Sequence, residues 1–231
     1  MGGMWDGIYS QFQEHEGMSI YRDVRPAFKK RPFLTIVTLF LGRTFIFPKW
    51  MASLRTLQYP KDQIMLLWVY AGTAMSTFGK MLKSNMKALD QYHSRLLVCN
   101  PNLERYYGEN GKIRHRIICA TYNFSRIYLE ESDFVFLLED DVIVPPESVI
   151  KLMELMRNKR VGMAVGFLRY RPMDGNHGTP LVWEFTPTFQ SYNGNFSKGY
   201  AVNCVSAQDD GVEEVGSGTF GCTLIREPLW R

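Results

Sequence analysis

Three consecutive acids, Glu139, Asp140 and Asp141, form the group in this sequence that is best suited to chemistry. They follow the apolar run Phe-Val-Phe-Leu-Leu, so they stand where a buried strand is expected to end. If the extended backbone continues, Glu139 and Asp141 project to the same side, roughly 6–7 Å apart along the strand, because side chains alternate. Carboxylate oxygens so placed can bind a divalent cation, and hard oxygen ligands favour Mg²⁺ or Mn²⁺.

A second interpretation of the three acids stays open. In an acidic turn, Asp140 or Asp141 would accept hydrogen bonds from nearby backbone amides and serve the fold alone. The metal-site interpretation is favoured by position, because open α/β sheets bind ligands beyond the carboxyl ends of their strands.

The remaining reactive side chains indicate no competing site. The four cysteines show no C-x-x-C pairing, and no second His stands at a spacing typical of zinc ligands. The phosphate-binding P-loop pattern and the surroundings of a nucleophilic serine are both absent. With no secretory signal at the start of this sequence, we expect reduced thiols and a cytoplasmic location, including the inner membrane surface as a peripheral site.

The elements that must position the acids alternate between strand and helix. Apolar, β-branched runs predict strands at residues 33–39, 64–70, 95–99, 134–138 and 161–168. Helical periodicity and first-turn prolines predict helices that begin near Pro48 and Pro145, with further helices at residues 78–92 and 113–129. This order predicts the α/β class, with an open, mostly parallel sheet and helices on both faces.

Two flanking regions lack that alternation. Residues 1–31 are expected to form an N-terminal arm, and its basic run at residues 29–31 is interpreted as a solvated face rather than a nucleic-acid patch. Residues 169–210, rich in Gly, Asn, Pro and aromatics, are expected to form a long functional loop. The chain has 231 residues and a formal charge of +4, and its apolar runs are too short or too interrupted to predict a membrane-spanning segment.

Three segments, taken together and in order, resemble the GT-A glycosyltransferases, most of all the large inverting family-two enzymes. Residues 134–153 are similar to the D-x-D strand and following helix of these enzymes. Residues 33–39 and 53–60 resemble their first strand and a helix that ends in "SL..Q.YP". Residues 216–227 are similar to their glycine-rich acceptor-side segment ending in "LIRR". The resemblance covers roughly residues 32–231, which we therefore expect to form one nucleotide-sugar-binding catalytic domain of the Rossmann-like GT-A type.

The resemblance implies an enzyme that moves a hexosyl group, with inversion, from a UDP or GDP sugar to a carbohydrate or other hydroxyl acceptor, with Mn²⁺ or Mg²⁺ as cofactor. It implies that Asp141 ligates the metal and that Glu139 contacts the ribose, or the metal through water. The donor would also be bordered by Thr38, Leu39, Phe40, Arg43, Tyr70, Asn123, Arg126 and Asp140. On the acceptor side we expect Trp183, Gly216 and Gly218, although Trp183 could equally fix its loop to the domain and the glycines could be turn residues.

The chain departs from the family pattern at two places. The usual "VDDGS" ending of the second strand is replaced by Trp-Val-Tyr-Ala-Gly-Thr, where Tyr70 would stack on or hydrogen-bond the base. The family's catalytic acid normally follows the "LIRR" segment, so residues 32–231 are expected to lack it, leaving Asp209 and Asp210 as candidate bases. Two alternative functions stay open: a sugar-nucleotide nucleotidyltransferase, and a non-catalytic carbohydrate-binding or scaffold module with a decayed donor site.

Overall fold

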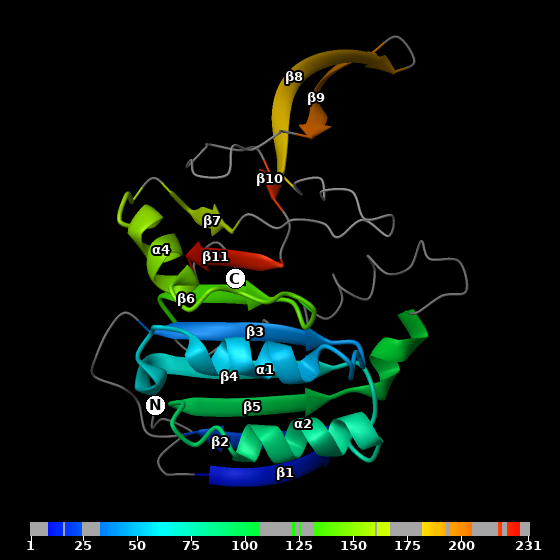
Figure 1. The fold of residues 1–231 in the computed structure, drawn as a ribbon. Coiled ribbons are helices and arrows are strands. Elements are labelled where there is room, and N and C mark those ends of the chain that lie inside the picture. Colours follow the sequence, from blue (N-terminus) through cyan, green and yellow to red (C-terminus); the bar gives the residue numbers. More distant parts are fainter. Residues whose placement is uncertain are drawn as a thin grey trace, which may run out of the picture.

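The computed structural model describes residues 9–15, 17–24, 33–106, 122, 125, 132–159, 161–166, 182–192, 195–204, 217–218 and 221–226. An eight-stranded sheet with strand order β1-β2-β5-β4-β3-β6-β11-β7 forms the centre of the molecule (Figure 1). Its strands are β1 (Tyr9–His15), β2 (Met18–Val24), β3 (Leu34–Phe40), β4 (Ile64–Tyr70), β5 (Ser94–Cys99), β6 (Phe134–Leu138), β7 (Met163–Val165) and β11 (Cys222–Arg226).

The four central strands are parallel, as the sequence predicts. β3 pairs in parallel with both β4 and β6, and β4 pairs in parallel with β5. β2 and β11 run antiparallel to their neighbours on the two sides of this parallel core. The predicted open α/β sheet is therefore confirmed, with antiparallel strands added toward both edges.

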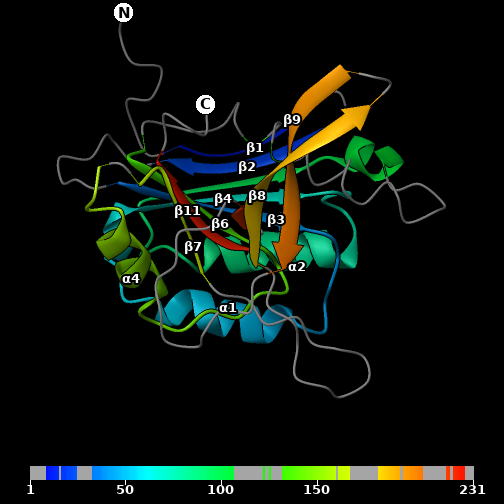
Figure 2. The ribbon, with the colours of Figure 1, turned by 90° about the horizontal axis from the view of Figure 1, so that it is seen from above.

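Each central strand is buried on both faces because its side chains alternate between two apolar clusters. On β3, Leu34, Ile36 and Phe40 enter one cluster and Val37 enters the other. The first face is covered by α1 (Phe47–Thr56), α2 (Thr77–Lys87) and α4 (Ser148–Leu155), which lie on one side of the sheet in Figure 2. Against the second face pack Leu103 of the 3₁₀ helix η2 (Pro101–Tyr106) and the helical residue Tyr122.

The sequence pattern explains where the helices begin. Pro48 occupies the first turn of α1, where its missing N–H costs nothing. Ser76 caps α2, since its hydroxyl oxygen accepts a hydrogen bond from the Gly79 N–H at 3.0 Å. A short 3₁₀ helix, η1 (Lys61–Gln63), leads into β4. Among the described residues, no helix combines the length and the apolar character that crossing a bilayer requires.

The two flanking regions differ from their predicted form. Residues 1–31 contribute the hairpin β1–β2, and β2 extends the main sheet by pairing with β5. Residues 169–210 contain the hairpin of β8 (Val182–Tyr192) and β9 (Asn195–Cys204), which forms a second, three-stranded sheet with β10 (Ser217–Gly218) (Figure 1).

Candidate active site

The three acids lie at the switch point of the sheet, where strands that follow β3 in sequence are placed on both of its sides. From β3 the chain proceeds through β4 to β5 on one side, whereas β6 lies on the other side of β3. The carboxyl ends of β3 and β6 are therefore neighbours, and the residues that follow each strand meet there. Open α/β sheets bind ligands at such a switch point.

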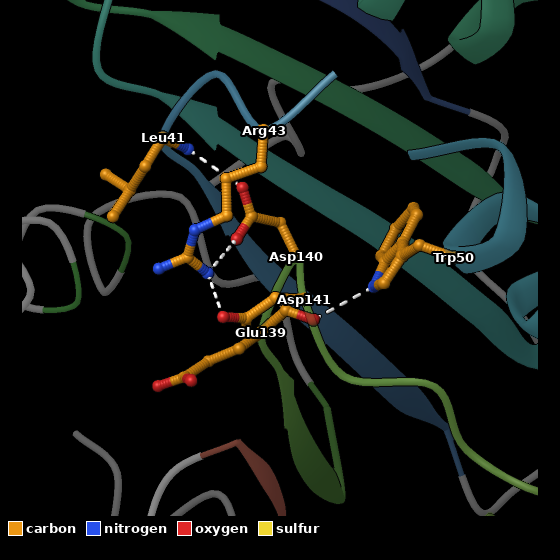
Figure 3. A network of polar contacts seen from close by, with 6 residues as sticks. All are labelled: Leu41, Arg43, Trp50, Glu139, Asp140 and Asp141. Atoms are coloured by element: carbon orange, nitrogen blue, oxygen red, sulfur yellow. Dashed lines mark hydrogen bonds and ion pairs between the residues drawn. The ribbon is translucent and has the colours of Figure 1, made fainter. Parts of the chain in front are cut away.

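Asp140 is fixed by the loop that follows β3. Its Oδ2 accepts a hydrogen bond from the Leu41 N–H at 3.0 Å, and its Oδ1 accepts one from Arg43 Nη1 at 2.9 Å (Figure 3). Asp140 is only 3% exposed. Gly42, between the two donors, has a φ of +86°, a left-handed conformation that favours glycine and turns the chain back on itself. Asp140 thus accepts a backbone hydrogen bond, as the acidic-turn interpretation of the sequence predicts.

Asp141 and Glu139 are placed differently. The Asp141 side chain is 40% exposed and forms an ion pair with Arg43 Nη1, while the Glu139 side chain extends away from Arg43 (Figure 3). β6 ends at Leu138, and the Val142 N–H donates to the Glu139 carbonyl at 3.2 Å, so the acids lie in a turn. The spacing expected from a continuing strand therefore does not apply.

Burial and mutual repulsion oppose the ionisation of the acids in this turn. Burial, and next the charge of Asp141, raise the pKa of Glu139 from its ordinary 4.5 to about 7. Burial likewise raises the pKa of Asp140 to about 6, against the opposing effects of the Leu41 N–H and of Arg43. Burial, and then all three carboxylates, raise the pKa of the Tyr122 phenol. Among the described residues, the charge of Arg43 offsets this opposition to ionisation only in part.

The donor chemistry of Glu139 and Asp141 fits Mn²⁺ or Mg²⁺, because such a cation would stabilise the Glu139 charge that burial, and next the charge of Asp141, oppose. Within the described part of the chain, no three His, Cys, Asp or Glu side chains converge as a preformed metal-binding group. The two carboxylates would therefore act together with water or substrate oxygens, as is usual for magnesium-type sites.

Of the other predicted donor-site residues that the structure describes, only Arg43 contacts the acids directly. The side chains of Thr38, Leu39 and Phe40 are 0–4% exposed and belong to the interior of the sheet. Tyr70 is 8% exposed, and its hydroxyl lies 3.2 Å from Ser76 Oγ at the carboxyl end of β4. Outside the described residues lie Asn123, Arg126, Asp209, Asp210 and Gly216.

The glycine-rich segment reaches the acids through its backbone. The Glu139 N–H donates to the Gly221 carbonyl at 3.1 Å, immediately before β11. Gly218 lies in β10, where it pairs with Val182, and Trp183 of β8 pairs with Ser217. The main-chain connection from Gly221 to Gly218 and β8 thus joins the second sheet to the region of the acids.

Two contacts of the site were not predicted from the sequence. The Trp50 indole N–H of α1 donates to the Glu139 carbonyl at 3.0 Å (Figure 3). Tyr122 lies close enough to the acids for their charge to affect its pKa, whereas the prediction from the sequence named Asn123 and Arg126. Gly42 was the available signal for the loop, since a glycine just after a buried strand often marks a turn with positive φ.

No protein-family model and no curated protein matches the sequence. Among solved structures, the fold is similar to mannosyltransferase PcManGT from Pyrobaculum calidifontis, in complex with GDP-Man and Mn²⁺, at 15% identity and a TM-score of 0.46, over 64% of this chain and 38% of that chain. It is similar to S. aureus TarS 1-349 at 14% identity and a TM-score of 0.43, over 67% of this chain and 41% of that one. It is also similar to the TarS 1-349 complex with UDP-GlcNAc, at 12% identity and a TM-score of 0.42, over 62% of this chain and 36% of that one. The chain spans less than half the length of each of these structures.

Proposed function

We propose that this protein is a metal-dependent glycosyltransferase that takes a sugar from a nucleoside diphosphate donor. The observation that carries the proposal is the acidic turn at the switch point of the sheet, where Asp140 is fixed and Asp141 stays 40% exposed. The ordered sequence resemblance to GT-A enzymes supports the same assignment. Asp140 would shape the turn, whereas Glu139 and Asp141 would bind the metal.

Asp141 and Glu139 would hold Mn²⁺ or Mg²⁺, which when bound supplies Lewis-acid stabilisation to a departing diphosphate. Arg43 lies beside both Asp140 and Asp141 and would bind a donor phosphate oxygen, since guanidinium groups suit phosphate geometry. Tyr70, at the adjacent end of β4, is the proposed contact for the base. If the transfer inverts, a carboxylate must take the acceptor proton. Asp209 and Asp210 are the proposed candidates, with Trp183 and Gly216 on the acceptor side.

Calorimetry with UDP and GDP, in Mn²⁺ and in EDTA, tests the assignment. We expect binding only with the metal, and we expect Asp141→Asn to remove most of it without lowering the melting temperature. Asp62→Asn is the matched control, because Asp62 is exposed in η1 at the opposite, amino end of β4. Equal affinity in EDTA would exclude the metal, and normal binding by a destabilised Asp141→Asn variant would make Asp141 a structural residue.

A second assay separates transfer from the related nucleotidyl chemistry. A glycosyltransferase releases nucleoside diphosphate from a UDP or GDP sugar, whereas a nucleotidyltransferase releases or consumes pyrophosphate. Release of UDP or GDP that depends on Mn²⁺ and on Asp141 is the expected result. Turnover of pyrophosphate with no release of diphosphate would contradict the proposal.

A further inference from the structure

Helix α1 contacts the segment that carries the acids at several separate points. Trp50 Nε1 donates to the Glu139 carbonyl at 3.0 Å, and Ser53 Oγ bridges both the N–H and the carbonyl of Val144 at 3.1 Å each. Just beyond the helix, the Gln58 N–H donates to the Pro146 carbonyl at 2.7 Å. These hydrogen bonds span the whole segment from residue 139 to residue 146.

We propose that α1 positions the acidic turn for metal and donor binding, with Trp50 and Ser53 as its positioning residues. The inference rests on the proposed function, because it assigns these residues a part in forming that same site. Both side chains bind backbone groups of residues 139–146 and not the carboxylates, so each acts through the main chain of this segment.

Trp50 can fix the Glu139 carbonyl because its own ring is held tightly. It is fully buried, and its ring centroid lies 5.1 Å from that of Phe40, 6.0 Å from that of Phe47 and 5.6 Å from that of Trp68. A ring packed on several sides occupies one orientation, so the direction of its N–H is set by the core.

The peptide that joins Glu139 to Asp140 is held from two sides as a result. Its carbonyl accepts the Trp50 N–H, while the Asp140 side chain accepts from Leu41 and Arg43. The orientation of this peptide determines where the Glu139 and Asp140 side chains project. Groups that orient metal ligands typically change metal affinity roughly 10–100-fold when they are removed.

Trp68 provides a matched control for Trp50. Trp68 is also fully buried and packs in the same aromatic cluster, but its Nε1 has no hydrogen-bond partner among the described residues. Trp50→Phe and Trp68→Phe therefore remove similar volume from one core, and only the first removes a hydrogen bond to the acidic turn. Differences between the two variants isolate the positioning role from packing.

The first readout is hydrogen exchange of the ligand-free chain, which does not depend on the proposed function. The Val142 N–H donates to the same Glu139 carbonyl, so we expect this amide to exchange faster in Trp50→Phe than in Trp68→Phe. Ser53→Ala, a smaller change in the same helix, should speed exchange of the Val144 amide. If neither amide responds, α1 does not hold the segment and the inference is wrong.

The second readout is calorimetric binding of Mn²⁺ with UDP or GDP. We expect Trp50→Phe to weaken it roughly tenfold or more, Ser53→Ala to weaken it less, and Trp68→Phe to leave it near the wild-type value. Equal weakening by both tryptophan variants would assign the effect to packing and overturn the inference. Should Trp50→Phe fail to fold, unchanged binding by Ser53→Ala overturns it instead. Absence of binding by the wild type would contradict the proposed function, while hydrogen exchange would still decide whether α1 holds the turn.

Discussion

At the scale of single residues, adjacent acids in one turn have different physical environments. Asp140 is buried and accepts hydrogen bonds from Leu41 and Arg43, whereas Asp141 is exposed enough to meet a ligand. Ionisation of Glu139 is opposed by burial and by the charge of Asp141. Without a bound cation, its charge should destabilise the folded chain.

We predict that Glu139→Gln stabilises the metal-free protein at alkaline pH. The folded-state pKa is raised from 4.5 to about 7, so the penalty is absent below pH 4.5, grows as the pH rises to 7 and is complete above it. The gain in Glu139→Gln should therefore grow over that range to the order of 1–3 kcal/mol. Melting in EDTA between pH 4.5 and 8 measures it, with exposed Glu154→Gln on α4 as control. A gain that does not change with pH would contradict the assignment of this pKa.

At the scale of secondary-structure elements, a buried ion pair joins the N-terminal hairpin to the parallel core. Arg95 of β5 pairs with Asp23 of β2, and the two residues are 5% and 7% exposed. The same guanidinium donates to the carbonyls of Met86 and Lys87 at 3.0 and 2.9 Å, at the end of α2. One side chain thus fixes three elements.

We predict that Arg95→Met destabilises the protein by roughly 3–5 kcal/mol, because it leaves the Asp23 charge buried without a partner. The double variant Asp23→Asn, Arg95→Met should recover part of this loss, since the unpaired charge is then gone. Urea unfolding at pH 7 measures both, beside Arg55→Met, which alters an exposed arginine in the last turn of α1. A single variant no less stable than the double variant would show that the ion pair does not hold β2.

The elements that the sequence predicts well are those whose burial is complete. β3, β4 and β6 are continuous apolar runs, and only a buried parallel strand suits such a run. β2 was missed because Ser19, Arg22 and Asp23 interrupt its apolar residues, and its place depends on an ion pair to a strand far along the chain. Local pattern carries no information on such a pairing.

The candidate site was likewise predictable only in part. Glu139, Asp140 and Asp141 stand out in the sequence, but the contacts that distinguish them join residues 99 and 89 positions apart. The buried, fixed state of Asp140 follows from the meeting of β3 with β6, not from its immediate neighbours. Thr38, Leu39 and Phe40 were named from the family resemblance at the end of the first strand, yet the strand continues through Phe40 and buries all three.

At the scale of the whole molecule, the site joins two parts of the sheet that are distant in sequence. The turn after β6 is held by the loop after β3, by α1 and by the residue before β11. α1 and the strands β3, β6 and β11 all contribute side chains to the same large apolar cluster on the α1 face. A ligand that binds the turn should therefore stabilise the whole sheet, since local opening there disturbs its core.

We predict that Mn²⁺ and UDP or GDP, added together, raise the melting temperature of the chain, and that neither does so fully alone. A ligand at about 100 times its Kd stabilises the folded state by ~2.7 kcal/mol, provided that the unfolded chain does not bind it. For a domain of this size that corresponds to a rise of about 5–10 °C. Scanning fluorimetry of wild type and Asp141→Asn measures it, and the variant should show no rise because it lacks the exposed carboxylate. Mn²⁺ alone should partly offset the repulsion at Glu139, so its smaller effect should vanish in Glu139→Gln. A rise of equal size in EDTA would place nucleotide binding away from the acids, and a rise retained in Asp141→Asn would show that binding does not need the Asp141 carboxylate.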